Sequence, residues 1–438
     1  MVKQPSSEFG ALVATATTHF RAGRLAEAES GYRAALAMVP ADPTVTLNLA
    51  VAIAAQGRHR EAIGSFDEAL RADPGFASAH HNRAVALLKL GETADAIKAF
   101  SRAASLDPQH YEAHRALGFL WLAQGERGRA LDHLARTYEL RRGDDRTGIA
   151  RNSLAAATRH KLEHDAEQFD YLAQRTRDRL RFELLARSYR AVAQQLSDHA
   201  TPLAQAQIEV LGEDYNTPIN LRAAPEIADR AVNERSDRTE LAAEFAAQRA
   251  VCVDDLLTAP ALQSLQRFLL EGTIWHDFSH IDGFVACYLE DGLACPLVLQ
   301  IADELRHAFP DILGAHALSQ AWAFKALRPQ AAVDVHADDA AVTINFWVTP
   351  TEACLNPDRG GLVVCRTPPP GDWQIEGYEA DQTRIVTFLE QNAENSLVVP
   401  YRQNRAVIFR SRLFHYSDHP EFASGYDNHR VNLTLLYG

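Results

Sequence analysis

A period of 34 residues runs through the first third of the chain and constrains its fold more than any other feature. Glycine, alanine, aromatic and proline positions all keep this interval. The columns are Gly23, Gly57, Gly91 and Gly125; Ala28, Ala62, Ala96 and Ala130; Tyr32, Phe66, Phe100 and Leu134; Ala35, Ala69 and Ala103; and Pro40, Pro74 and Pro108. Five columns in one register indicate stacked copies of one supersecondary unit.

Each unit reads as two helices joined by a turn. Glycine in the turn is free to take a positive φ, alanine lets the two helices approach closely, and proline ends the second helix. This pattern resembles the tetratricopeptide repeat. The resemblance covers residues 9–144 within an N-terminal domain of residues 1–144, as units 9–42, 43–76, 77–110 and 111–144. Arg142 stands where the fourth proline would fall, so we interpret the last unit as the transition out of the array.

Repeats of this family stack into an all-α solenoid whose concave face binds peptides or partner proteins. The resemblance therefore implies a peptide or protein partner on that face. The alternative is that the array only braces the next domain or forms a homo-oligomer. The candidate contact residues lie on the expected first helices: His80, His81, Asn82, Arg83 and His114.

Composition excludes several other functions. Hydrophobic residues make up 47% and charged residues 23%, which is typical of a globular protein, and no apolar run approaches the roughly 20 residues that span a bilayer. The net charge of −13 argues against nucleic-acid binding. The five cysteines form no CxxC pair, and no apolar segment follows the N-terminus. We therefore expect no nucleic-acid or membrane partner, and a cytoplasmic protein with reduced cysteines.

Residues 145–249 are expected to be a helical linker or strap. Leu162, Phe169, Leu180 and Leu184 recur at roughly helical intervals within residues 161–195, which predicts an amphipathic helix or helix pair. Prolines punctuate residues 198–234, as in a strap laid across a neighbouring domain. His160 and His164 are four residues apart, but no third ligand follows, so we interpret them as surface residues of a helix.

Residues 250–438 are expected to form an α+β domain. Two helical segments precede a series of short strand-like runs with period-two alternation, among them AWAFKAL, VTINFWVT, GLVVCR, RAVIFR and RVNLTLLYG. Short antiparallel strands with helices packed on one sheet predict a jelly-roll or a barrel.

Two places in this region combine the residue types that bind a metal. His336 and Asp338 are two residues apart in extended chain, so their side chains point to the same side. His415 follows 79 residues later, at the expected end of a strand. Two imidazoles and one carboxylate form the facial triad that leaves positions open on Fe(II). Asp334 and Asp339 remain alternative carboxylates, and His419 is an alternative to His415.

An arginine near the C-terminus supplies a second kind of chemistry. Arg430 begins an Arg-x-Asn run in the last strand, which we expect to lie beside the strand that bears His415. A guanidinium there can hold a carboxylate by a two-point hydrogen bond. Asn345, Trp322, Phe324, Trp347 and Asn432 share faces of neighbouring strands and are candidates for lining the same pocket.

This layout resembles the Fe(II)- and 2-oxoglutarate-dependent oxygenases with a double-stranded β-helix (jelly-roll) fold. Within them it is similar to a bacterial group that couples tetratricopeptide repeats to such a domain. The matching stretches are HADDAAVTINFWVTP, GGLVV, VPYRQNRAVIF, LFHYSD and GYDNHRVNLTLLYG. The resemblance implies His336, Asp338 and His415 as iron ligands and Arg430 as the partner of the C5 carboxylate, with Asn345 a possible contact of the C1 carboxylate. The 15 residues from His415 to Arg430 exceed the family's usual spacing, and the loop at 421–426 would absorb the excess.

The implied activity is that of a dioxygenase, most simply a hydroxylase. Fe(II), 2-oxoglutarate and O2 would be the cofactor and cosubstrates, and the repeat array favours a peptide or protein as the prime substrate. One alternative is hydroxylation of a small molecule or of a carrier-bound metabolite. Another is a non-catalytic interaction scaffold that retains the oxygenase fold.

Overall fold

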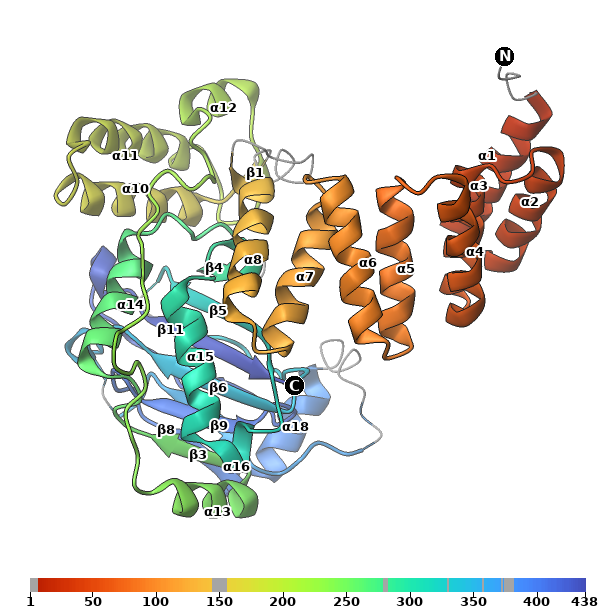
Figure 1. Cartoon of the computed structure of the whole chain (residues 1–438). Helices are drawn as coiled ribbons and strands as arrows, with labels where there is room; N and C mark the ends of the chain where they lie inside the picture. The colour runs from red at the N-terminus through yellow and green to blue at the C-terminus, as the bar shows by residue number, and fades with distance from the viewer. Residues whose placement is uncertain are drawn as a thin grey trace. The chain divides into compact units, whose positions relative to one another are not determined.

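The computed structural model describes residues 7–143, 156–278, 283–328, 331–356, 358–371, 373 and 382–438. The chain forms two compact units, which divide between Leu120 and Trp121 (Figure 1). The expected boundary between the repeats and the linker, at residues 144 and 145, lies outside the described residues. No described helix is long and apolar enough to cross a membrane.

The repeats are pairs of antiparallel helices. These are α1 (Ser7–Arg21) with α2 (Leu25–Met38), α3 (Pro43–Ala55) with α4 (His59–Ala72), and α5 (Ala77–Lys89) with α6 (Thr93–Leu106). The helices of the fourth repeat, α7 (Tyr111–Ala123) and α8 (Arg127–Arg142), follow in the chain. The four turn glycines all have φ between 73° and 79°, and a Cβ on any of them would meet no atom within 4 Å. Glycine is thus needed for its conformation and not for space.

The repeat columns form the core of the array, as predicted. Ala28, Ala62 and Ala96 are fully buried, and the aromatic residues Phe66 and Phe100 are almost completely buried. The second helices end two residues before the prolines at 40, 74 and 108. The sequence pattern therefore predicted both the helix ends and the buried faces of this unit.

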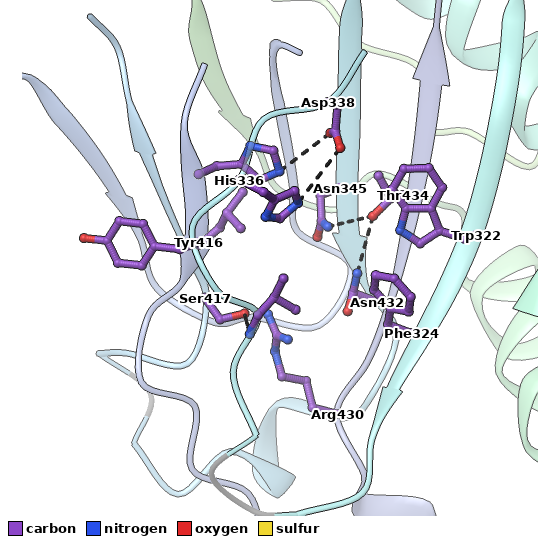
Figure 2. Close-up of a pocket in the computed structure, with 13 residues that line it drawn as sticks. Trp322, Phe324, His336, Asp338, Asn345, Tyr416, Ser417, Arg430, Asn432 and Thr434 are labelled. Carbon is purple, nitrogen blue, oxygen red and sulfur yellow. Dashed lines mark hydrogen bonds and ion pairs between the residues drawn. The ribbon is translucent and has the colours of Figure 1, made fainter. Parts of the chain in front are cut away.

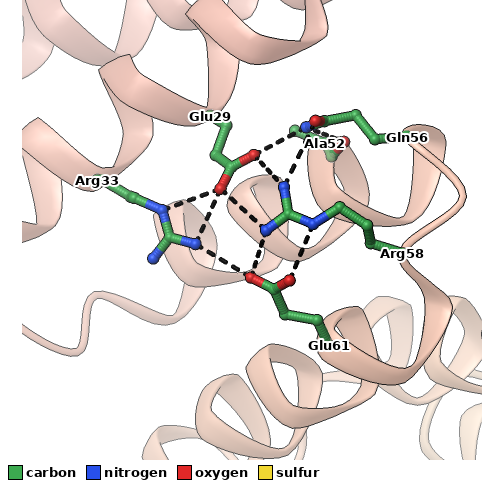
Figure 3. A network of polar contacts seen from close by, with 6 residues as sticks. All are labelled: Glu29, Arg33, Ala52, Gln56, Arg58 and Glu61. Carbon is green, nitrogen blue, oxygen red and sulfur yellow. Dashed lines mark hydrogen bonds and ion pairs between the residues drawn. The ribbon is translucent and has the colours of Figure 1, made fainter.

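A polar network joins the first two repeats (Figure 3). Glu29 on α2 accepts hydrogen bonds from Arg33, from Arg58 at 2.7 Å and from Gln56 at 2.9 Å. Glu61 on α4 accepts from Arg58 at 2.5 Å. Burial acts to raise the pKa of Glu29, but the hydrogen bonds from Gln56, Arg58 and Arg33 outweigh it and lower this pKa to about 2.

We expect Glu29→Gln to destabilise the protein by about 1 kcal/mol, because two guanidinium groups lose a shared anion. The carboxylate contributes stability above its unfolded pKa of 4.5, and this contribution is lost as the pH falls toward 2. Urea unfolding followed by circular dichroism at pH 7 and pH 3 measures both effects. Glu68→Gln, which removes an exposed partner 3.8 Å from Arg71, is the matched control. An equal effect of the two changes would contradict the role given to Glu29.

The second unit begins within α7 and includes α8, whose C-terminal end is tied to the sheet domain. Arg142 forms a bidentate ion pair with Asp291, at 2.8 Å (Nε to Oδ1) and 2.6 Å (Nη2 to Oδ2), and both side chains are buried. Tyr138 Oη lies 2.7 Å from His276 Nε2. Burial acts to raise the pKa of Asp291, but the hydrogen bond and charge of Arg142 lower it to about 2. The last repeat helix is therefore part of the second unit.

A helical hairpin and a strap follow. Helices α10 (Arg159–Ala173) and α11 (Arg179–Ala193) share a core around Phe169 and Tyr189, as the amphipathic pattern predicted. Leu180 and Leu184 are nevertheless exposed, because α11 buries Phe182, Ala186 and Tyr189 instead. The other elements of this segment are β1 (Ala156–Ala157), β2 (Thr201–Pro202), α12 (Gln205–Leu211) and α13 (Arg238–Gln248).

The hairpin also corrects the interpretation of His164. This side chain is 3% exposed and hydrogen-bonds Asp165, which pairs with Lys161 one helical turn earlier. The cluster is buried because α10 packs against the sheet domain, with Gln168 donating to the carbonyls of Leu270 and Gly272.

Two antiparallel sheets form the centre of the second unit (Figure 1). The larger has six strands in the order β3-β9-β6-β11-β5-β4, and the smaller has three in the order β10-β7-β8. The strands are β3 (Ala250–Val253), β4 (Phe284–Tyr288), β5 (Leu318–Ala326), β6 (Val342–Trp347), β7 (Leu362–Cys365), β8 (Ser396–Val399), β9 (Ala406–Arg410), β10 (His415–Ser417) and β11 (Val431–Tyr437). A shared core that includes Trp347, Phe409, Val364 and Val399 shows that the sheets pack face to face.

Helices cover the opposite face of the larger sheet (Figure 1). Tyr437 on β11 donates to the carbonyl of Ala302 on α15, and Lys325 on β5 is fully buried, with Nζ 3.4 Å from the centre of the Tyr426 ring. Trp322 and Phe324 alternate with Lys325 along β5 and face the smaller sheet's side. The helices of this region are α14 (Ala259–Glu271), α15 (Pro296–Ala308), α16 (Pro310–Leu313) and α18 (Gln382–Gln391).

We expect Asp291→Asn to destabilise the second unit by about 3 kcal/mol, because it removes the carboxylate from a buried bidentate pair. The contribution of Asp291 is present above its unfolded pKa of 3.8 and is lost as the pH falls toward 2. Chemical denaturation of the full chain measures the loss. Glu139→Gln on the same helix, where the partner Arg136 lies 2.8 Å away and Glu139 is 55% exposed, should change stability by no more than about 1 kcal/mol.

Candidate metal centre

His336 and His415 are brought together by backbone pairing. The two residues form an antiparallel bridge, in which each amide donates to the other's carbonyl, at 3.1 and 2.9 Å. Their imidazole rings consequently lie side by side, with ring centres 4.1 Å apart (Figure 2). The amide of Asp338 donates to the carbonyl of Ser411 at 2.9 Å. The backbone pairing between the two segments therefore extends from His336 to Asp338.

Hydrogen bonds to the backbone orient both imidazoles. Nδ1 of His336 lies 2.8 Å from the carbonyl oxygen of Asp334, and Nδ1 of His415 lies 3.0 Å from that of Leu413. A carbonyl oxygen only accepts, so each Nδ1 carries the proton and donates. Each Nε2 therefore keeps a free lone pair, which is the arrangement found in metal-binding histidines.

Asp338 lies opposite these two lone pairs. Its Oδ1 is 3.9 Å from Nε2 of His336, and its Oδ2 is 3.6 Å from Nε2 of His415. The hydroxyl of Thr343 lies 2.8 Å from Oδ2 and 2.9 Å from the hydroxyl of Ser411, which fixes the carboxylate from behind. Burial, reinforced by neighbouring His336, lowers the pKa of His415 to about 4. The imidazole of His415 is therefore neutral at neutral pH.

The alternative ligands lie elsewhere. His336, Asp338 and His415 place one ligand atom each within 4.8 Å of one another, and they form the one such group in the part of the chain that the structure describes. Asp334 and Asp339 are exposed, and the side chain of His419 is 73% exposed. The geometry therefore favours the predicted set over each rival.

Arg430 approaches the same pocket from the opposite end (Figure 2). It is 3% exposed, and it donates from Nε to the carbonyl of Gly360 at 3.2 Å and from Nη2 to that of Gly361 at 3.4 Å. Its Nη1 is buried without a hydrogen-bond partner among the described residues. Burial lowers the pKa of Arg430 to about 10, so the group remains cationic at neutral pH.

Neutral polar and aromatic side chains lie between the two ends. Asn345 on β6 donates to the hydroxyl of Thr434 on β11 at 2.9 Å. Asn432 lies two residues before Thr434 on β11, on the same face and closer to Arg430 in the chain. Trp322 and Phe324 on β5 form the adjoining wall. The space free of protein atoms between these side chains, counted together with the open solvent at the mouth of the pocket, is about 360 Å³.

Trp347 is the predicted pocket residue that does not line the pocket. It shares a face of β6 with Asn345 but is fully buried, with its ring centre 5.5 Å from that of Tyr401. Trp347 lies two residues after Asn345 on β6. At that position residues of the smaller sheet pack against the Trp347 ring, so it belongs to the core between the sheets.

The strand carrying His415 also differs from the prediction. His415 does not end the strand of residues 406–410; it begins β10, which pairs with β7 in the smaller sheet. The final strand β11 pairs with β5 and β6 and does not lie beside β10. The turn at 411–413 carries the chain from one sheet to the other, so His415 and Arg430 reach the pocket from facing sheets.

Five further residues line the pocket that the sequence had not indicated: Val333, Leu362, Tyr416, Ser417 and Thr434. Ser417 and Thr434 stand two residues after His415 and Asn432, so strand alternation could have identified them. Val333 belongs to an irregular segment, which Ser417 holds through two hydrogen bonds of 3.0 and 3.1 Å. No local pattern indicates such a position.

Comparison with known proteins identifies the N-terminal unit. Family models described as tetratricopeptide repeat match residues 13–75 and 77–110. The N-terminal repeats are tetratricopeptide repeats. They belong to a class of protein-interaction modules, and the two matches lie outside the sheet domain.

Solved structures similar to this chain are also tetratricopeptide-repeat proteins. The first tetratricopeptide-repeat domain of Spaghetti (RPAP3), bound to an HSP90 peptide, is 22% identical, with a TM-score of 0.27, and the match covers 28% of this chain and 99% of that one. A thermophilic protein of Thermus thermophilus is 24% identical, with a TM-score of 0.28 and coverage of 30% and 74%. A protein of Parabacteroides merdae is 21% identical, with a TM-score of 0.29 and coverage of 43% and 73%. No curated protein matches the chain.

We expect Gly361→Ala to damage the Arg430 end of the pocket. A Cβ on Gly361 would lie 1.8 Å from the carbonyl oxygen of Val399, so the chain must shift, and the carbonyls that hold Arg430 shift with it. Thermal unfolding should show a loss of at least about 2 kcal/mol, in the range of overpacking. Gly371→Ala, whose Cβ would meet nothing within 4 Å, is the control. Unchanged stability of Gly361→Ala would show that this turn is not constrained as described.

Proposed function

We propose that this protein is an Fe(II)- and 2-oxoglutarate-dependent oxygenase that hydroxylates a peptide or protein. The main support is one pocket with a metal-ligand triad at one end and a buried, incompletely hydrogen-bonded arginine at the other. Two facing antiparallel sheets around such a pocket are consistent with a double-stranded β-helix. Tetratricopeptide repeats in the same chain favour a macromolecular substrate over a small molecule.

The donor set fits Fe(II). His336 and His415 would each bind through Nε2, since their Nδ1 protons are donated to backbone carbonyls. Asp338 would complete a two-histidine, one-carboxylate face, which leaves positions open for other ligands. Thr343 and Ser411 would keep the carboxylate oriented, and such supporting bonds raise metal affinity.

The far end of the pocket fits a carboxylate. A buried guanidinium without a counter-anion is costly, and a carboxylate that accepts hydrogen bonds from the guanidinium of Arg430 would satisfy Nη1. A dicarboxylate that reaches from the triad to Arg430 would pass Asn345, Thr434 and Asn432, whose amide and hydroxyl groups would orient it. Bound Fe(II) and 2-oxoglutarate would supply O2 activation and hydroxylation, coupled to loss of CO2 and formation of succinate.

The chain's remaining contribution is to position the reactants and exclude water. His415 and Asp338 are almost completely buried, whereas the side chain of His336 is 34% exposed. The open side of the site is therefore at His336, and we place the entry of the prime substrate there. Sequestering a reactive centre in this way prevents side reactions.

A non-catalytic scaffold is the competing account, favoured by the interaction repeats. A scaffold role does not explain why the Nε2 lone pairs of His336 and His415 converge or why the charge of Arg430 is buried. A scaffold should lose its partners when the repeat surface is altered and should be indifferent to His336→Ala.

Anaerobic titration with Fe(II) and 2-oxoglutarate tests the proposal. The wild type should develop the visible charge-transfer band of chelated 2-oxoglutarate, and His336→Ala should not. His419→Ala, an exposed histidine outside the triad, is the matched control and should behave as the wild type. The absence of a band in the wild type would contradict the proposed function.

We expect Arg430→Met to weaken 2-oxoglutarate binding by about 10- to 150-fold, since charge-assisted hydrogen bonds contribute roughly 1.5–3 kcal/mol. The same change should leave the free energy of unfolding equal or higher, because it removes a buried charge that has no counter-anion among the residues the structure describes. Calorimetric titration and urea unfolding of the same preparation measure both. Lost stability together with unchanged binding would place Arg430 in the core and not in the site.

A further inference from the structure

An aromatic wall extends from the pocket along the inner face of β4 and β5. Trp322 and Phe324, whose ring centres are 6.1 Å apart, line the pocket, and Tyr288 and Phe284 on β4 continue the wall at 6.5 Å from Trp322 and 6.1 Å from Phe324. This cluster contains no residue of the smaller sheet. Trp322 and Tyr288 are half-buried, so part of the wall beside the pocket is open to solvent.

The wall contains one unused hydrogen-bond donor. Nε1 of Trp322 is buried and has no partner among the described residues. Trp322 pairs with Thr434 across the strands, at the level of Asn345, so the donor lies nearer the triad than Arg430 does. Leaving an indole N–H in this state is costly, and an acceptor on a bound ligand would remove the cost. Nε1 of Trp347 is in the same state within the core, whereas Trp322 lines the pocket.

The charges of the pocket are all assigned by the proposed function. His336, Asp338 and His415 would bind the metal and Arg430 the cosubstrate. Every other lining residue that the structure describes is uncharged. An ammonium, guanidinium or carboxylate of the prime substrate placed against Trp322 and Phe324 would therefore be desolvated without a remaining counter-charge among the described residues that line the pocket, which is strongly unfavourable. The carboxylate of Asp277 lies beside the wall but outside this lining, where it accepts from the Tyr288 hydroxyl at 3.1 Å.

We infer that the prime substrate presents an uncharged, apolar side chain of a peptide to this wall, with a peptide carbonyl accepting from Nε1 of Trp322. The inference rests on the proposed function and defines its substrate class. A blocked peptide backbone is neutral and brings carbonyl acceptors next to the side chain. A free amino acid brings two charges, for which the pocket has no remaining partner.

Binding of blocked pentapeptides Gly-Gly-X-Gly-Gly to the full chain tests the inference, with X as leucine, phenylalanine, lysine or aspartate. Saturation-transfer NMR gives the dissociation constants, and free leucine is a further probe. We expect the leucine or phenylalanine peptide to bind, and the lysine and aspartate peptides and free leucine to bind at least about tenfold more weakly. With Mn(II) and 2-oxoglutarate added, the side-chain protons of the bound peptide should broaden.

Trp322→Phe isolates the hydrogen bond, because it keeps a ring in the wall and removes only the N–H. It should raise the dissociation constant about three- to tenfold. Trp121→Phe, the same change in α7 and away from the residues that line the pocket, should have no effect. Equal binding of a charged peptide or of free leucine, no binding of either apolar peptide, or an unchanged constant in Trp322→Phe would each overturn the inference.

The charge-transfer measurement separates this inference from the proposed function. A normal band with no discrimination among the peptides would overturn the substrate class alone. An absent band, with Trp322-dependent binding of the apolar peptides retained, would contradict the oxygenase and leave the aromatic wall as a peptide-binding site.

Discussion

The pairing of residues 336–338 with residues 411–415 is the interaction on which the candidate site depends. It is short, consisting of the reciprocal bonds between His336 and His415 and the bond from Asp338 to Ser411. Because the chain changes sheets between Arg410 and His415, this pairing also joins the larger sheet to the smaller one. The backbone pairing thus brings the Cα atoms of His336, Asp338 and His415 close together. Hydrogen bonds to backbone carbonyls then orient the two imidazoles, and the hydroxyl of Thr343 orients the carboxylate.

The opposite end of the pocket shows a different physical principle. Arg430 is held by two carbonyl oxygens and retains its charge in a buried environment. Such a group reduces stability unless an anion binds, so its presence is easier to explain by binding than by folding. Two other pairs of buried charges in this unit are matched: Arg142 with Asp291, and Lys161 with Asp165. Lys325 is also buried, and its Nζ has no hydrogen-bond partner among the described residues but lies over the Tyr426 ring. Arg430 differs from the ion pairs in having no carboxylate partner among the described residues, and from Lys325 in lining the pocket, where an anion could reach it.

The sequence predicted features that depend on local geometry. The 34-residue columns located turns, helix ends and buried faces of the repeats, because each column repeats the same contact. Residues two apart in extended chain were expected to point to the same side. On this basis we predicted that His336 lies near Asp338 and that Trp322 lies near Phe324, and both pairs are close in the structure. In each case the spacing along the chain determines the spacing in the structure.

Features that depend on which elements pack together could not be predicted. Leu180 and Leu184 follow a helical period yet are exposed, because the neighbour of α11 covers another face. His164 was interpreted as a surface residue and is buried by the sheet domain. Trp347 was expected in the pocket, but the smaller sheet closes over it. The change of sheet before His415 has no local signal, since residues 409–415 (FRSRLFH) contain neither glycine nor proline to mark a turn.

The most direct test of the central claim is a crystal structure of the full chain grown without oxygen in the presence of Fe(II) and 2-oxoglutarate. We expect an anomalous iron peak bounded by Nε2 of His336, Nε2 of His415 and the carboxylate of Asp338, with the far carboxylate of 2-oxoglutarate on Arg430. An iron peak at other residues, or 2-oxoglutarate bound away from Arg430, would contradict the account.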